Sequence, residues 1–107
     1  MKPGMIKLSV MYPTGEGKTF DMDYYLSTHI PLVSKLLGDA VKGATVEEGV
    51  AGVAPGAPAT FAAMGNIYFE SIESFQNSFG PNAPEILADL PNFTNAEPTV
   101  QVSKVMA

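Results

Sequence analysis

Apolar residues recur at every second position along several segments, and this spacing predicts β-strands. Residues Ile6 to Tyr12 place alternate side chains on one face, and residues Phe61 to Phe69 repeat the pattern. Two shorter segments, Ala44 to Glu48 and Thr99 to Val105, predict two further strands. The glycine-, alanine- and proline-rich stretch 49–59 predicts a flexible connection between the second strand and the third.

A spacing of three and four residues predicts a helix between Asp21, a plausible N-cap, and Gly38, a plausible stop. Pro31 lies inside this helix and has no amide hydrogen for the carbonyl of Ser27, so we expect a kink or a restart there. The apolar stripe of the helix comprises Met22, Tyr25, Leu26, His29, Ile30, Val33, Leu36 and Leu37.

A second helical pattern follows the third strand. Ser71 is placed to cap a helix that runs through Phe79, and the tripeptide Gly80-Pro81-Asn82 predicts its end. A short helix is predicted from Pro84 to Leu90, and residues 91–98 are predicted to form a shaped loop.

The predicted order is strand, helix, strand, strand, helix, strand. This order indicates an α+β, ferredoxin-like βαββαβ fold with a four-stranded antiparallel sheet, as one domain over residues 1–107 with residues 1–4 flexible. Both helices would cover one face of the sheet. The other face would carry Met11, Met64 and Tyr68, and pairing of two sheets in a homodimer would cover it.

Composition narrows the functional classes. The chain has 11 acidic and 6 basic residues and no run of basic ones, so nucleic acid and anionic membranes are poor partners. No stretch approaches the length of a membrane span, which suggests a cytoplasmic protein. There is no cysteine and one histidine, so we expect no metal site. The glycines before Lys18 match only part of a phosphate-binding loop, and we expect no cofactor.

The single histidine, His29, is the candidate for chemistry. Imidazole exchanges protons near neutral pH, so His29 is the predicted catalytic acid or base. Tyr25 lies one helical turn before it, and Asn66 and Tyr68 are predicted to face it from the third strand. The alternative is a structural histidine that hydrogen-bonds the freed carbonyl of Ser27 or a group of the sheet.

Two motifs resemble those of the EthD family, which is named for ethyl tert-butyl ether degradation and belongs to the dimeric ferredoxin-like α+β barrels. One runs from Tyr25 through His29-Ile30-Pro31-Leu32, and the other is Asp89-Leu90-Pro91-Asn92-Phe93-Thr94-Asn95. The resemblance extends from Met5 to Val105. It implies a homodimer whose two sheets close into a barrel, with a cavity between each sheet and its helices.

The resemblance also implies roles for single residues. His29 would be the base that fungal relatives are proposed to use in dehydrating or decarboxylating aromatic polyketides. Tyr25, Tyr68 and Phe93 would line the pocket and bind substrate, and Asn92, with Thr94, would shape the loop that closes it. Some members belong to gene clusters for oxidative degradation of small organic compounds, and many are described as reductases.

Three functional hypotheses follow. The first is an enzyme or accessory protein with a hydrophobic pocket, in which His29 moves a proton α to the carbonyl of a small apolar or aromatic compound, without a cofactor. The second is a non-catalytic carrier that delivers a hydrophobic small molecule to an oxygenase. The third is a protein whose pocket is filled by side chains and which only forms dimers.

Overall fold

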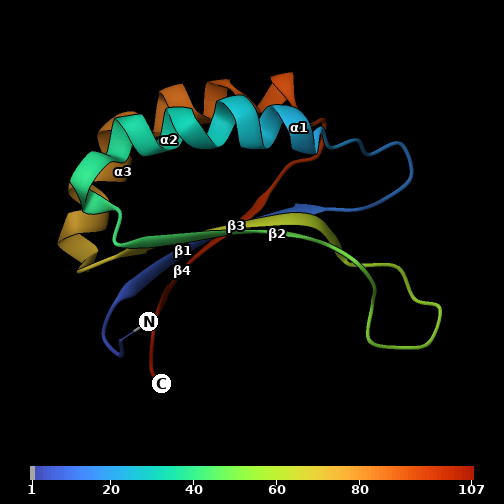
Figure 1. Cartoon of the computed structure of the whole chain (residues 1–107), viewed down its shortest axis with the longest axis horizontal. Helices are drawn as coiled ribbons and strands as arrows, with labels where there is room; N and C mark the ends of the chain where they lie inside the picture. Colours follow the sequence, from blue (N-terminus) through green and yellow to red (C-terminus); the bar gives the residue numbers. More distant parts are fainter. Residues whose placement is uncertain (1) are drawn as a thin grey trace.

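The computed structural model describes residues 2–107 and has the element order predicted from the sequence (Figure 1). The strands are β1 (Ile6–Pro13), β2 (Gly43–Glu48), β3 (Phe61–Phe69) and β4 (Thr99–Lys104). The first helical segment comprises α1 (Met22–Tyr24), η1 (Tyr25–His29), α2 (Ile30–Leu37) and η2 (Gly38–Ala40), and the second comprises α3 (Ile72–Ala88) and η3 (Leu90–Asn92). The strands pair antiparallel in the order β2-β3-β1-β4, with both helical segments on one side (Figure 1). The predicted α+β fold is confirmed.

Cross-strand pairing divides the side chains of the sheet between two faces. On the face toward the helices, the two central strands carry the buried residues Ile6, Leu8, Tyr12, Ala63 and Phe69. Lys7 and Ser9 alternate with these residues along β1, and their partners on β3 are Tyr68 and Asn66. These four side chains therefore belong to the opposite face, which the helices leave uncovered.

The space between helices and sheet holds two clusters of buried side chains. An aliphatic cluster lies under α2 and α3 and contains Ile6, Leu8, Val33, Leu37, Phe69 and Ile86. An aromatic cluster lies under the start of the first helical segment and contains Tyr12, Tyr25 and Phe93, with Phe20 packed against it. In this cluster the rings of Tyr12 and Tyr25 meet edge-on, with centroids 5.7 Å apart. Edge-on contacts of this kind hold aromatic rings in defined orientations.

The first helical segment begins as predicted and then widens. The Asp21 side chain caps it by accepting a hydrogen bond from the Tyr24 amide at 3.0 Å. Residues Tyr25–His29 form a π-helical turn, in which the Ile30 amide donates to the Tyr25 carbonyl five residues earlier. An α-helix then restarts and carries Pro31 in its first turn, where the missing amide hydrogen is tolerated. The expected restart near the proline therefore takes the form of a π-helical turn.

The predicted end of the second helix at Gly80-Pro81-Asn82 is wrong, because α3 continues to Ala88. Ser71 caps this helix as predicted and accepts from the Ser74 amide at 3.0 Å. The Asn82 side chain donates to the Ser78 carbonyl at 2.8 Å and to the Leu36 carbonyl at 3.2 Å. The bond to Leu36 joins α3 to the first helical segment beside the stretch where Pro81 and Pro84 lack amide hydrogens.

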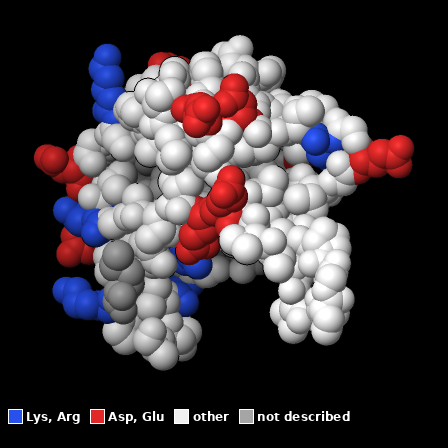
Figure 2. All heavy atoms as spheres, turned by 45° about the vertical axis from the view of Figure 1, so that its right-hand side comes forward, with Lys and Arg blue, Asp and Glu red and all other residues white. Residues whose placement is uncertain are grey.

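The connection between β2 and β3 projects beyond the sheet, on the side away from the helices (Figure 1). Figure 2 shows it as a lobe without charged side chains. The Gly52 amide donates to the Ala57 carbonyl at 2.8 Å, and the Thr14 hydroxyl donates to the Ala59 carbonyl at 2.7 Å. The connection predicted to be flexible therefore has a defined turn at its tip and an anchor at its base.

The N-terminal residues lie beside the C-terminal strand. The Gly4 amide donates to the Val105 carbonyl at 2.7 Å. The flexibility expected for residues 1–4 stays a prediction, and Met1 lies outside the described residues. Within residues 2–107, no helix combines the length and the apolar character needed to cross a bilayer.

Candidate functional site

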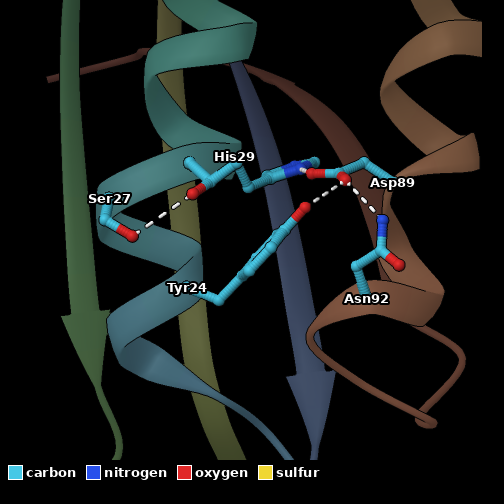
Figure 3. A network of polar contacts seen from close by, with 6 residues as sticks. Tyr24, Ser27, His29, Asp89 and Asn92 are labelled. Carbon is cyan, nitrogen blue, oxygen red and sulfur yellow. Dashed lines mark hydrogen bonds and ion pairs between the residues drawn. The ribbon is translucent and has the colours of Figure 1, made fainter.

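His29 and Asp89 form a hydrogen-bonded pair where the first helical segment meets the end of α3 (Figure 3). The Nδ1 atom of His29 lies 2.9 Å from the Oδ2 atom of Asp89. His29 is 3% exposed, because the π-helical turn directs its side chain inward. A carboxylate at Nδ1 holds the hydrogen on that nitrogen and leaves Nε2 free to accept a proton.

The carboxylate of Asp89 is itself held from two directions (Figure 3). Its Oδ1 atom accepts from the Tyr24 hydroxyl at 2.7 Å and from the Asn92 amide at 2.9 Å. Burial acts to raise the pKa of Asp89, but hydrogen bonds from Asn92, Tyr24 and His29 outweigh it and hold the pKa below its usual value. Asp89 therefore stays ionised at neutral pH and fixes the orientation of the imidazole.

Aromatic rings surround the imidazole. Tyr25 stacks on His29 with ring centroids 5.4 Å apart and an interplanar angle of 18°. Phe93 lies closer, with centroids 4.6 Å apart. The loop that carries Phe93 is anchored by Thr94, whose hydroxyl donates to the Thr19 carbonyl at 2.7 Å. The shaped loop predicted after Leu90 thus closes over the site.

A cavity of about 60 Å³ lies beside this site, between the sheet and α2. Its wall includes Tyr12, Tyr25, Val33, Val46, Gly65 and Phe79. Tyr25 borders both the cavity and the imidazole, whereas His29 is not part of the wall. The cavity is mostly apolar, as small-molecule sites in proteins usually are, but it is small for such a site.

The structure brings together four of the residues predicted for the site. His29 contacts Tyr25 and Phe93 directly, and Asn92 reaches the same Asp89 carboxylate.

The interpretation that Asn66 and Tyr68 face His29 is wrong, because strand register puts both side chains on the uncovered face of the sheet. Asn66 is buried there and donates to the Thr45 hydroxyl at 3.1 Å.

Two residues of the site were missed by sequence reasoning. Asp89 opens the second EthD-like motif, and a carboxylate at the start of that motif was the available signal. Tyr12 was placed on one face of the first strand and given no role in the site, but it lines the cavity. Burial raises the pKa of its hydroxyl well above the usual range, with a further contribution from Tyr25.

Within residues 2–107, no three His, Asp or Glu side chains gather into a cluster suited to a metal ion. His29 and Asp89 supply one imidazole and one carboxylate, and the Asp89 oxygens already accept three hydrogen bonds. These oxygens have little capacity left for a metal.

Comparisons with known proteins place this arrangement in a family. The model of the EthD domain matches residues 14–97, which include both sequence motifs and the His29–Asp89 pair. The comparison with curated proteins finds no match.

The chain resembles several solved structures, including the following two. An EthD-like protein from Ralstonia eutropha is 43% identical, with a TM-score of 0.91 over 99% of this chain and 96% of that one. An ethyl tert-butyl ether degradation (EthD) family protein from Bacillus halodurans is 21% identical, with a TM-score of 0.67 over 95% of this chain and 99% of that one, and supports the fold alone. The match to the family model covers most of the residues, and the chain therefore belongs to the EthD family.

Proposed function

We propose that the protein is an enzyme that moves a proton on a small apolar or aromatic carbonyl compound. The observation that carries this proposal is the pairing of His29 with Asp89, which presents an oriented imidazole with a free Nε2 atom. In the proposed step, Nε2 takes a proton from the carbon next to the carbonyl, and the electron pair of that C–H bond moves into an enolate. Return of the proton to carbon completes the cycle without an oxidant or a reductant.

The neighbouring tyrosines are poor candidates for the base. Burial raises the pKa of Tyr25 to about 12, and contact with Tyr12 lowers it only in part. Burial raises the pKa of Tyr12 still further. Both hydroxyls are therefore protonated at neutral pH and act as hydrogen-bond donors, which suits them to stabilise the enolate oxygen.

Proton transfer requires the ligand to come within hydrogen-bond reach of Nε2. The Tyr25 ring stacks on His29 and also borders the cavity. The proposal therefore requires the ligand and the imidazole to meet at the edge of this ring, while the ring itself stays in place.

Deuterium exchange tests the proposal. Acetone is incubated in D₂O with the protein, and loss of its α-proton signal is followed by NMR. We expect the wild type to accelerate exchange and His29→Phe to bind the ketone without accelerating it. Equal exchange rates with wild type and His29→Phe would remove His29 from the reaction.

A second candidate function is a carrier of hydrophobic molecules. It is favoured by one observation, that His29 does not border the cavity. A carrier needs the cavity but not the imidazole, so binding of acetone without exchange in either protein would support it over the enzyme.

We also propose that the protein is a homodimer that pairs the uncovered faces of two sheets. Met11, Met64 and Tyr68 are half-buried on this face in a single chain. A carboxylate in the centre of such an interface would lose its hydration, so Met64→Glu is expected to convert the dimer into a folded monomer. Sedimentation equilibrium gives the mass, with Val53→Glu in the exposed connection between β2 and β3 as the matched control. A monomeric wild type, or a dimeric Met64→Glu protein, would contradict the proposed interface.

A further inference from the structure

The hydroxyl groups of Tyr12 and Tyr25 meet beneath the start of the first helical segment, at the end of the cavity nearest His29. Tyr12 comes from β1 and Tyr25 from η1, and both side chains are 2% exposed. The aromatic cluster fixes both rings: Tyr12 lies 5.0 Å from Phe20, and Tyr25 lies 5.2 Å from Phe93, between ring centroids. Two polar groups are thus held rigidly at the edge of an apolar space.

Gly65 makes room for this arrangement. The Tyr25 hydroxyl oxygen rests directly over Gly65 in the middle of β3, and a Cβ atom at that position would collide with it. Glycine weakens a strand interior, so its presence there indicates a close approach by another group. Here the approaching group is a hydroxyl at the cavity wall, and Gly65 itself lines the same cavity.

The two hydroxyls leave one proton without an acceptor. Contact with Tyr25 raises the pKa of Tyr12 beyond the effect of burial, whereas contact with Tyr12 lowers the pKa of Tyr25 against the effect of burial. These shifts indicate that the two hydroxyls interact, and in such a pair only one of them can donate to the other. The Tyr24 hydroxyl donates to Asp89, but within the described chain the Tyr25 hydroxyl makes no such bond to a carboxylate or a carbonyl.

We propose that the Tyr25 hydroxyl, supported by Tyr12 and seated over Gly65, binds the acceptor oxygen of a small apolar ketone in the cavity. The proposal rests on the proposed function and specifies its ligand: one acceptor oxygen on a compact hydrocarbon frame. A cavity of about 60 Å³ admits only a small molecule, since an engineered cavity of about 150 Å³ is filled by benzene. The enolate formed by proton removal would carry its charge on the oxygen that Tyr25 holds.

A matched pair of ligands tests the proposal. Acetone and isobutene have nearly the same shape and the same number of heavy atoms, but only the ketone accepts a hydrogen bond. Dissociation constants from NMR titration of the full chain are expected to favour the ketone by about fivefold to tenfold, the usual value of one buried hydrogen bond. Tyr25→Phe keeps the ring and is expected to bring this preference close to one.

Tyr68→Phe is the matched control, because Tyr68 lies on the opposite face of the sheet. We expect this substitution to leave the preference for the ketone unchanged. Three results would overturn the proposal. The Tyr25→Phe protein could keep the preference, the Tyr68→Phe protein could lose it, or the wild type could fail to bind either probe. Thermal unfolding confirms that each variant is folded. An intact preference without deuterium exchange would leave this binding site standing and reject the enzyme. Exchange that depends on His29, with a ketone preference that Tyr25→Phe does not change, would support the enzyme and reject this binding site.

Discussion

Replacement of Asp89 by alanine is expected to lower the free energy of unfolding by about 2–3 kcal/mol, because buried hydrogen-bonding groups lose their partner. The Asp89 carboxylate accepts from Tyr24, His29 and Asn92. His29 is buried against the rings of Tyr25 and Phe93, so removal of the carboxylate leaves its Nδ1 atom without a partner. Equilibrium urea unfolding at pH 7 measures the loss. A change below about 0.5 kcal/mol, typical of a surface substitution, would show that the pair contributes little to stability.

Asp89→Asn tests the orientation of the His29 imidazole separately from the stability of the fold. The amide oxygen of asparagine can still accept from Tyr24 and Asn92, but its amino group then faces Nδ1 of His29. Nδ1 must become the acceptor, so the imidazole hydrogen moves to Nε2 and the free base is lost. We expect a smaller loss of stability than with alanine, together with loss of α-proton exchange. Imidazole ¹⁵N chemical shifts report the tautomer directly.

The same pair predicts a dependence of stability on pH. Hydrogen bonds hold the pKa of Asp89 below its usual value in the folded state. Its contribution is therefore present above the unfolded-state pKa of about 4 and is lost as the pH falls through the lower folded-state value. The stability difference between wild type and Asp89→Asn is expected to narrow as the pH falls below about 4. A stability difference that persists at pH 2 would show that it arises from hydrogen-bond geometry rather than from the charge of Asp89.

Features that repeat along the chain could be predicted from the sequence. The alternation over Phe61–Phe69 identified β3 to the residue, because burial on one face imposes a period of two. The helix cap at Asp21 followed equally from local chemistry. Hydrogen bonds between distant residues follow no such period. His29 and Asp89 are 60 residues apart, and the residues around Asp89 do not identify His29 as its partner.

Two errors have the same physical origin. Helix α3 continues past Pro81 because Asn82 reaches a carbonyl 46 residues away, at Leu36, and such tertiary bonds override the local preference of proline. Asn66 and Tyr68 were expected near His29, but a strand alternates strictly, and Gly65 already faces the helices. Both residues lie an even number of positions from Met64, so their side chains share its face of the sheet and cannot point toward His29.

Gly65→Ala is expected to lower the free energy of unfolding by roughly 1–3 kcal/mol, the usual cost of overpacking a core. Alanine would ordinarily stabilise a strand interior relative to glycine. At this position the added Cβ atom would collide with the Tyr25 hydroxyl oxygen. The Tyr25 ring resists displacement because it stacks on His29 and meets Tyr12 edge-on. Urea unfolding of the two proteins measures the cost.

A second substitution identifies the cause. Tyr25→Phe removes the hydroxyl oxygen, and the next atom of that ring, Cζ, is 3.7 Å from the Cβ position at residue 65, an ordinary contact. Alanine at position 65 is therefore expected to be neutral or stabilising in the Tyr25→Phe protein. The double-mutant cycle would then give a coupling of roughly 1–3 kcal/mol. An equal loss in both backgrounds would place the strain in the backbone of β3 instead.

The same cycle distinguishes packing from ligand binding, because Gly65→Ala displaces the Tyr25 oxygen without removing it. If the position of that oxygen determines ketone binding, the preference for acetone over isobutene should fall in Gly65→Ala to the level of Tyr25→Phe. The double variant should show no further decrease, since both substitutions act on one hydrogen bond. A Gly65→Ala protein that is destabilised but keeps the full preference would show that the glycine serves packing alone.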